Sequence, residues 1–198
     1  AIAYSEKNMK SRARGEQMDR IADALMQQRG EQGVIDWING IDHNVKENDM
    51  LSYKQHATRQ AVEKIARNDR DKAIQFISDN ATEQFIDSDT LERTSRYVSR
   101  TSIADEVQWL ADLPSEVKGQ RHALGERFEE FIKEDFAGAG DWLSSQPLGP
   151  AYDEAIQDYA MSAAKDNPEA ALAWVDRISD DRIRNYTLGR LTPKEKRE

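Results

Sequence analysis

The 198-residue sequence contains no cysteine. Disulfide bonds, thiolate metal ligands and cysteine nucleophiles are therefore excluded. Proline is also scarce, with 5 residues, and aromatic residues make up only 8% of the chain. No apolar run approaches the roughly 20 residues that a membrane-spanning helix needs, so we do not expect a membrane-spanning protein. No stretch of useful length alternates apolar and polar residues, which argues against β-strands.

The sequence also lacks a concentrated basic region. The formal net charge is -9, and residues 100–198 hold 13 basic and 20 acidic groups, against 15 and 17 in residues 1–99. The basic residues from Lys7 to Arg14 are diluted by Glu6 and Glu16, as on a solvated helix face, although a site for an anionic partner is the alternative. Because binding to a phosphate backbone needs a concentrated basic surface, we expect no nucleic-acid partner.

Composition favours a structure with a thin core. Hydrophobic residues are 38% and charged residues 33% of the chain, which is polar for a compact globule but ordinary for a stack of helices. The length allows one large domain or two small ones, and we expect a single helical domain over 1–198. The sequence starts at Ala1 without methionine, as a processed or trimmed product would.

A large aromatic residue recurs along the chain at spacings of 39, 33, 33 and 32 residues. The five positions are Trp37, Phe76, Trp109, Trp142 and Trp174. The next residue is aliphatic each time: Ile38, Ile77, Leu110, Leu143 and Val175. The residue two positions before the aromatic is also aliphatic, with Gly140 as the exception. A period near 33 residues is the length of a helical hairpin with its turns and is typical of an α-solenoid.

The pattern therefore predicts an all-α fold, a right-handed α-solenoid of about five helical hairpins and about eleven helices. The aromatic residues fall on predicted short helices over 31–40, 70–79, 103–112, 138–145 and 168–178. Longer amphipathic helices are predicted over 47–67, 115–134 and 151–165, with a last helix over 181–191. Ser102 and Ser115 are expected N-caps, and Pro168 suits a first helical turn. We expect each aromatic residue to supply most of the anchoring area of its short helix, with a ligand-stacking row as the alternative.

Residues 152–174, YDEAIQDYAMSAAKDNPEAALAW, resemble the second helix of a tetratricopeptide repeat followed by the start of the next repeat. The matching positions are Tyr152 to Ile156, Ala163, Asp166, Pro168 and Trp174. Asn167 separates the acid from the proline, and no Leu-Gly pair follows the tryptophan. The chain is more similar to uncharacterised bacterial D-P-x-x-A-x-x-W hairpin-repeat proteins, which are TPR-like and HEAT-like. That resemblance implies a helical repeat fold without established activity and an extracytoplasmic, periplasmic location rather than a cytoplasmic one.

Residues for catalysis or metal binding are few. His43, His56 and His122 are the only histidines, and none lies in a metal-ligand spacing. Acidic residues from Glu126 to Asp135 share one predicted helix, but Arg127 and Lys133 are interleaved with them, as on a charged outer surface. We therefore predict no catalytic residue, no metal and no cofactor.

Two functions follow from this pattern. The first is a non-catalytic scaffold that binds a protein or peptide on one face of the longer helices. Its expected contact residues are Tyr53, Arg59, Arg96, Arg121 and Tyr152, on the assumption that they are exposed. The alternative is an all-helical enzyme or small-ligand-binding protein in which the carboxylates of 126–135 meet His122 or His43.

The last predicted helix has no partner after it in the sequence. Its apolar residues Ile183, Tyr186, Leu188 and Leu191 would lie at the end of the stack, where an uncapped hydrophobic surface tends to associate. We therefore expect a cap or a homo-oligomer contact at the C-terminal end.

Overall fold

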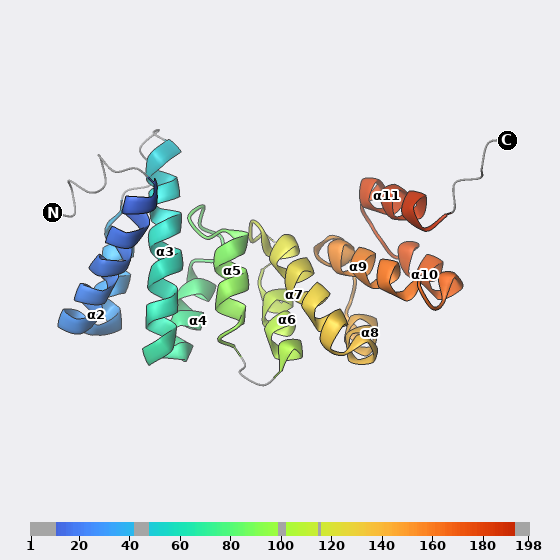
Figure 1. The fold of residues 1–198 in the computed structure, drawn as a ribbon, viewed down its shortest axis with the longest axis horizontal. Coiled ribbons are helices and arrows are strands. Elements are labelled where there is room, and N and C mark those ends of the chain that lie inside the picture. The colour runs from blue at the N-terminus through green and yellow to red at the C-terminus, as the bar shows by residue number, and fades with distance from the viewer. Residues whose placement is uncertain (1–10, 42–47, 99–101, 115, 193–198) are drawn as a thin grey trace. The chain divides into compact units, whose positions relative to one another are not determined.

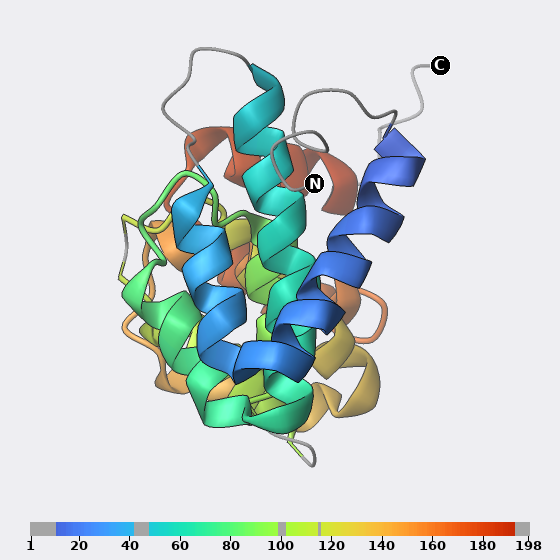
Figure 2. The ribbon, with the colours of Figure 1, turned by 90° about the vertical axis from the view of Figure 1, so that its left-hand side faces the viewer.

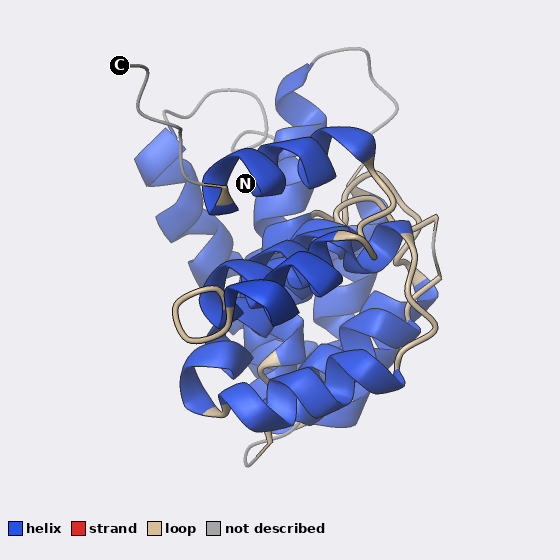
Figure 3. Ribbon diagram, turned by 90° about the vertical axis from the view of Figure 1, so that its right-hand side faces the viewer, coloured by secondary structure: helices blue, strands red, loops and turns tan. Residues whose placement is uncertain are grey.

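The computed structural model describes residues 11–41, 48–98, 102–114 and 116–192 of the chain (Figure 1). All regular structure in these ranges is helical, which confirms the all-α prediction (Figure 3). The elements are α2 (Ser11–Gly40), α3 (Asn48–Asn68), α4 (Arg70–Asp79), α5 (Ser88–Ser95), α6 (Ile103–Asp112), α7 (Gln120–Glu134), α8 (Phe136–Ser145), a 3-10 turn η1 (Pro150–Tyr152), α9 (Asp153–Ala163), α10 (Pro168–Val175) and α11 (Asp181–Leu191). None of the helices in these ranges combines the length and the apolar composition that a bilayer span needs.

The chain divides into two compact units. Unit 1 comprises residues 1–100 with 116–118 and contains α2 to α5. Unit 2 comprises residues 101–115 with 119–198 and contains α6 to α11. A single domain over 1–198 stays a prediction.

The aromatic residues fall on short helices close to the predicted ranges. We use the name aromatic helices for α4, α6, α8, α10 and the 31–40 segment of α2, and the name intervening helices for α3, α5, α7, α9 and α11. The 31–40 segment is separate because Gly30 interrupts α2 with a φ of 65° and a ψ of -163°. A positive φ costs glycine little, because glycine has no Cβ. The sequence pattern did not predict α5, because its residues SDTLERTS are mostly modest helix formers.

Polar caps fix where several helices begin. The Asp87 carboxylate accepts a hydrogen bond from the Thr90 amide at 2.9 Å, and so starts α5. The Ser102 hydroxyl accepts from the Asp105 amide at 3.3 Å, as expected for an N-cap. Pro168 occupies the first turn of α10, also as predicted. Ser115 lies outside the described residues, and α7 begins only at Gln120.

Unit 1 is built around α3. The two segments of α2 form a V, and α2 packs against α3 (Figure 2). The core between them is aliphatic, with Val34, Ile38, Ala57, Ala61 and Ile65 fully buried. Lys64 of α3 reaches back to two carboxylates of α2, at 2.9 Å from Asp19 and in a shorter contact with Asp23.

The core of unit 2 is richer in rings. Phe128 of α7 is fully buried, and its ring centroid lies 6.1 Å from that of Phe131 and 5.5 Å from that of Trp142. Tyr159 of α9 stacks on Phe136 at 4.7 Å and meets Trp174 edge-on at 5.2 Å. These contacts join α7, α8, α9 and α10, so aromatic packing links successive helices of this unit.

The aliphatic residue after each recurrent aromatic is buried more completely than the aromatic itself. Ile38, Ile77, Leu110, Leu143 and Val175 are all fully buried. Trp109, Trp142 and Trp174 are only half-buried. The aliphatic side chain therefore faces the core directly, while the larger indole lies at its edge with one side toward solvent. That each aromatic residue supplies most of the anchoring area of its short helix stays a prediction, because a large ring that is partly exposed can still bury as much area as a smaller side chain that is fully buried.

Gly140, the exception in the repeat pattern, has a packing reason. A Cβ atom added at Gly140 would lie 2.2 Å from the Tyr159 hydroxyl oxygen and 2.8 Å from Cζ of the same ring. Any side chain at position 140 would therefore displace Tyr159. The aliphatic residue found here in the other aromatic helices is replaced by glycine to make room for the ring.

Candidate functional site

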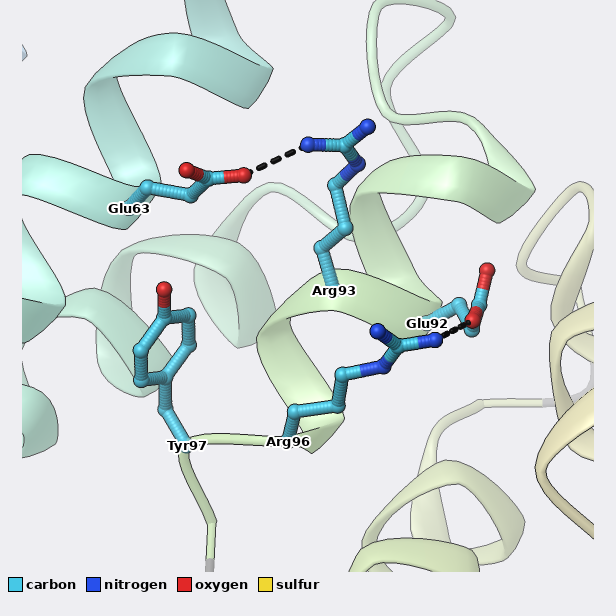
Figure 4. A pocket seen from close by; sticks show the side chains of 5 residues that line it. All are labelled: Glu63, Glu92, Arg93, Arg96 and Tyr97. Carbon is cyan, nitrogen blue, oxygen red and sulfur yellow. Dashed lines mark hydrogen bonds and ion pairs between the residues drawn. The ribbon is translucent and has the colours of Figure 1, made fainter. Parts of the chain in front are cut away.

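A polar hollow of about 310 Å³ lies in unit 1 beside α3 and α5 (Figure 4). Its lining residues are Glu63, Glu92, Arg93, Arg96 and Tyr97. The Arg93 guanidinium donates to the Glu63 carboxylate at 2.5 Å, and Arg96 donates to Glu92 at 2.5 Å. Both arginine side chains remain about half exposed. The hollow thus presents two held guanidinium groups and a tyrosine to solvent.

The register between α3 and α5 brings this hollow together. Arg59 of α3 donates to Asp89 at 2.8 Å and to Asp87, the N-cap of α5, at 2.9 Å. One turn later along both helices, Glu63 of α3 accepts from Arg93 of α5. Because both pairs advance in the same direction, α3 and α5 run parallel in register. The ion pairs of Arg59 and Arg93 therefore set the position of α5 and of the hollow at its end.

A second hollow, of about 370 Å³, lies in unit 2. It is lined by Arg121 of α7, Gln157 of α9, Asp180 before α11, and Arg182, Ile183 and Tyr186 of α11. Tyr186 is 58% exposed. The Arg121 guanidinium is held by Glu154 of α9 at 3.0 Å. This hollow therefore combines an aromatic and an aliphatic side chain with two arginines.

Asp153 positions the second hollow from within α9. Its side chain is fully buried and accepts from the Ser179 amide at 2.8 Å, the Ser179 hydroxyl at 2.8 Å and the Asp180 amide at 2.9 Å. Asp180 in turn caps α11 by accepting from the Arg182 amide at 2.8 Å, and this backbone contact lowers the pKa of Asp180. One buried carboxylate thus ties the start of α11 to the start of α9.

Titratable groups gather where α7 packs against α9, next to the second hollow. Glu154 lies between Arg121 and His122, whose Nδ1 is 3.4 Å from a Glu154 carboxylate oxygen. One turn further along α9, burial raises the pKa of Asp158 to about 7, with help from the charges of Glu129, Glu154 and Glu126. These residues lie on facing sides of two packed helices. No group of three or more His, Asp or Glu side chains within the described ranges could hold a metal ion.

The structure corrects two of the five expected contact residues. Tyr53 is 1% exposed and Tyr152 is 8% exposed, so the expectation that both are exposed is wrong. Tyr152 packs against Trp142, with ring centroids 6.2 Å apart, and burial followed by the charge of Asp112 raises its pKa. The reason in both cases is that helical spacing alone does not tell which face of a helix is inner.

The three expected arginines lie at the surface of their units. Arg96 lines the hollow of unit 1, and Arg121 lines that of unit 2. Arg59 is less exposed than either, at 20% of its side chain, and it anchors α5 rather than lining a hollow. The structure therefore does not bring all five residues to one surface, and their partner-binding role stays a prediction.

The three histidines likewise do not come together at one site. His43 lies outside the described residues, and His56 is exposed on α3. His122 lies 3.4 Å from Glu154 and 4.0 Å from Glu126, one of the carboxylates that the enzyme alternative required. Self-association through α11 is untested, although Tyr186 is the exposed apolar residue of that helix.

The sequence pattern did not reveal two buried carboxylates of unit 2, Asp153 and Glu106, or the half-buried Asp158. Asp153 and Asp158 read as ordinary helix residues in the sequence. Glu106, 11% exposed in its side chain, pairs at 2.5 Å with Arg127, 6% exposed. The signal for Glu106 lies in the repeat, since the same position holds Val34, Ala73, Ala139 and Ala171 in the other aromatic helices. A charged residue at a position otherwise small or aliphatic indicates a buried partner.

Comparison with known proteins does not assign the sequence to a family. No family model matches the sequence, and neither the curated proteins nor the solved structures include a significant match.

Proposed function

We propose that this protein is a non-catalytic helical-repeat scaffold that binds a protein or peptide segment along its intervening helices. The observation that carries the proposal is the location of the two hollows. All of their lining residues belong to intervening helices or to the residues next to their ends. The two linings contain none of the aromatic-helix residues that bury the repeat's apolar contacts.

The chemistry of the two linings fits recognition of another chain. Arginine and tyrosine are enriched in protein interfaces because each offers a large, partly apolar surface with polar groups at its end. Both hollows contain arginine, carboxylate or amide groups and one tyrosine. Fixed charges of both signs favour one orientation of a partner and penalise others. This arrangement supports binding of an extended segment better than chemistry on a small molecule.

Cross-helix contacts support the proposed solenoid. Arg59 to Asp89 and Arg93 to Glu63 each span 30 residues, Arg121 to Glu154 spans 33, and Trp142 to Gln108 spans 34. Equivalent positions of successive hairpins would be joined in this way with a period near 33 residues. We propose a right-handed α-solenoid on this basis. Small-angle scattering tests it, because an elongated arc and a compact globule of this length differ clearly in radius of gyration.

Binding can be tested with peptides selected by display on the full chain. Affinities of the selected peptides are then measured for Arg93→Ala/Arg96→Ala in the first hollow and for Arg182→Ala/Tyr186→Ala in the second. We expect one of these pairs to weaken binding by about tenfold or more, as truncation at an interface centre does. The matched controls are Arg70→Ala and Leu172→Ala, which change exposed side chains of the aromatic helices α4 and α10. Equal loss in the controls, or no selected peptide at all, would contradict the proposal.

The contact of His122 with Glu154 and Glu126 favours a second candidate function, binding or turnover of a small ligand beside α7 and α9. A histidine held by a carboxylate can donate or accept a proton near neutral pH. A thermal-shift screen with divalent metals and metabolites separates the two functions. Stabilisation by one compound class that is lost in His122→Gln would favour the small-ligand function over the scaffold.

A further inference from the structure

The second hollow, in unit 2, has an excess of positive charge among its lining residues. Arg121 and Arg182 line it together with a single carboxylate, that of Asp180. The hollow of unit 1 is balanced by contrast, because each of its two arginines contacts a glutamate that also lines it. The second hollow is thus the more basic of the two, in a chain whose formal net charge is -9.

The carboxylate of Asp180 is already engaged by the backbone. As the N-cap of α11, it accepts a hydrogen bond from the Arg182 amide at 2.8 Å and from the Ile183 amide at 3.3 Å. Its contact with the Arg182 guanidinium is longer, at 3.4 Å, and the Arg182 side chain is 91% exposed. Asp180 therefore satisfies the first amides of α11 rather than the guanidinium of Arg182, and a ligand in the hollow would be held by side chains.

Arg121 is held in a way that leaves its outer nitrogens open. Its Nε donates to Glu154 of α9 at 3.0 Å, and within the described residues the Arg121 side chain makes no other polar contact. A guanidinium fixed through Nε keeps one orientation, and its two terminal nitrogens can donate parallel hydrogen bonds to a carboxylate. Glu154 thus orients Arg121 without occupying the groups that would recognise a second carboxylate.

Apolar side chains flank these arginines. Ile183 and Tyr186 of α11 line the same hollow. Tyr186 is 58% exposed, more than any other large hydrophobic residue of the described ranges, and within those ranges it makes no ring contact and no side-chain hydrogen bond. Tyr152 and Tyr159 of the same unit, in contrast, both pack against tryptophans. An exposed tyrosine beside arginines is typical of protein interfaces.

We propose that the second hollow binds an acidic segment of a partner protein, with one Asp or Glu side chain on Arg121 and Arg182 and a neighbouring apolar side chain on Ile183 and Tyr186. This partner class rests on the proposed binding function. The net negative charge of the chain opposes a strongly acidic partner, so the segment presents a single acid rather than a run of acids.

The walls of the hollow are fixed before a partner arrives. The hollow is shared by α7, α9 and the start of α11. Asp153 of α9 ties the start of α11 in place by accepting three hydrogen bonds from Ser179 and Asp180. A site held in this way loses little freedom on binding, which favours affinity.

The test uses peptides selected by display on the full chain, with neutral sequence on both sides of the varied positions. We expect the selected sequences to share an Asp or Glu next to an apolar residue. Changing that acid to its amide should weaken binding by about tenfold, measured by fluorescence anisotropy. Selected peptides without a shared acid would overturn the proposed partner class and leave the scaffold function standing. Selection of no peptide at all would contradict both.

Charge reversal locates the acid. Arg182→Glu should weaken the best selected peptide by about tenfold or more, and changing the acid of the peptide to Lys should restore part of the affinity for this variant. Such a rescue cannot come from a misfolded protein. Arg190→Glu is the matched control, because Arg190 is an exposed arginine of α11 that does not line the hollow. An equal loss in the control would mean a general charge effect and would overturn the assignment.

Two further variants separate the halves of the site. Lysine keeps the charge of Arg121 but lacks the planar fork, so Arg121→Lys should weaken binding by about threefold. Tyr186→Ala should weaken the selected peptide by about tenfold, but should change little for a peptide whose apolar residue is replaced by Ser. Unchanged affinity in both variants would place the peptide elsewhere on the chain and overturn the assignment.

Other occupants of the hollow would give different results. The terminal carboxylate of a peptide could bind the same arginines, so each peptide is measured with a free and with an amidated C-terminus. Dependence on the free end instead of the internal acid would overturn the proposed partner class. A second copy of this acidic chain would give concentration-dependent self-association in sedimentation velocity that Arg182→Glu abolishes. That result would assign the hollow to a homo-oligomer and would likewise overturn it.

Discussion

Units 1 and 2 both alternate aromatic and intervening helices, but different forces join their parallel intervening helices. In unit 1, α3 holds α5 through the ion pairs of Arg59 and Arg93. In unit 2, α7 and α9 approach closely at Gly125, and the ring centroid of Phe128 on α7 lies 6.5 Å from that of Tyr159 on α9. Unit 1 thus relies on ion pairs for this alignment, while unit 2 adds close packing and ring contacts to the ion pair of Arg121 with Glu154.

The difference has an energetic consequence. Ion pairs that remain partly exposed contribute about 0 to 1 kcal/mol each, whereas a buried aromatic side chain contributes several times more. We therefore expect substitutions in the ring cluster of unit 2 to have large effects that depend little on salt. Substitutions in the ion pairs of unit 1 should have small effects that salt reduces.

The largest effect is expected from Phe128→Ala. Phe128 is fully buried and its ring lies near those of Phe131, Trp142 and Tyr159, so the variant loses apolar contact and leaves a cavity. We expect the free energy of unfolding to fall by about 4 kcal/mol, measured by urea denaturation. Phe136→Ala, which removes a ring that is 42% exposed, is the control and should cost much less. Equal costs would mean that the cluster is not centred on Phe128.

Asp153→Ala should have the next largest effect. It leaves the Ser179 and Asp180 amides without their acceptor, and the start of α11 loses its tie to α9. Because hydrogen bonds to a charged group are worth more than neutral ones, we expect a loss of about 3 kcal/mol in urea denaturation. Asp166→Ala, at an exposed position before α10, should be nearly neutral. Faster hydrogen exchange in α11 amides of the Asp153 variant would locate the loss at that helix.

Gly140→Ala tests the close approach of α8 and Tyr159. The added methyl group would overlap the Tyr159 ring, so we expect a cost of about 2 kcal/mol from overpacking. Tyr159→Phe removes the hydroxyl oxygen that lies nearest, and should recover part of this cost when combined with Gly140→Ala. Simple additivity of the two single changes in a double-mutant cycle would argue against a direct clash.

Much of the helical architecture could be predicted because one aromatic-aliphatic pair recurs. The positions of α4, α6, α8, α10 and α11 follow from that period and from residues such as Ser102 and Pro168, whose capping preferences are local. Such local signals do not predict a helix that depends on a contact with another helix. The helix α5 begins at a cap formed by Asp87 and is held by Arg59 from α3, so its existence depends on a contact that sequence spacing does not reveal.

The candidate site was less predictable, since exposure depends on which faces of two helices meet. Tyr53 and Tyr152 have polar ends and helical spacing, yet both are buried. Asp153 and Asp158 are chemically identical and lie on one helix, but the first faces backbone donors and the second faces carboxylates. Only their neighbours in the folded chain distinguish the two. Asp153 meets donors that lie 26 and 27 positions further along the chain, whereas Asp158 lies near carboxylates of α7 and of α9 itself.

The smallest predicted effect belongs to Arg59→Ala, and it sharpens the comparison most directly. Arg59 is paired with two carboxylates of α5 but stays partly exposed, so we expect a loss of about 1 kcal/mol at low salt. Raising NaCl to about 0.5 M shortens the screening length to a few ångströms and should shrink the difference between the variant and the wild type. The corresponding difference for Phe128→Ala should persist at the same salt concentration, because it arises from apolar contact. If both differences responded alike to salt in urea denaturation, charge would not distinguish how the two units align their parallel helices.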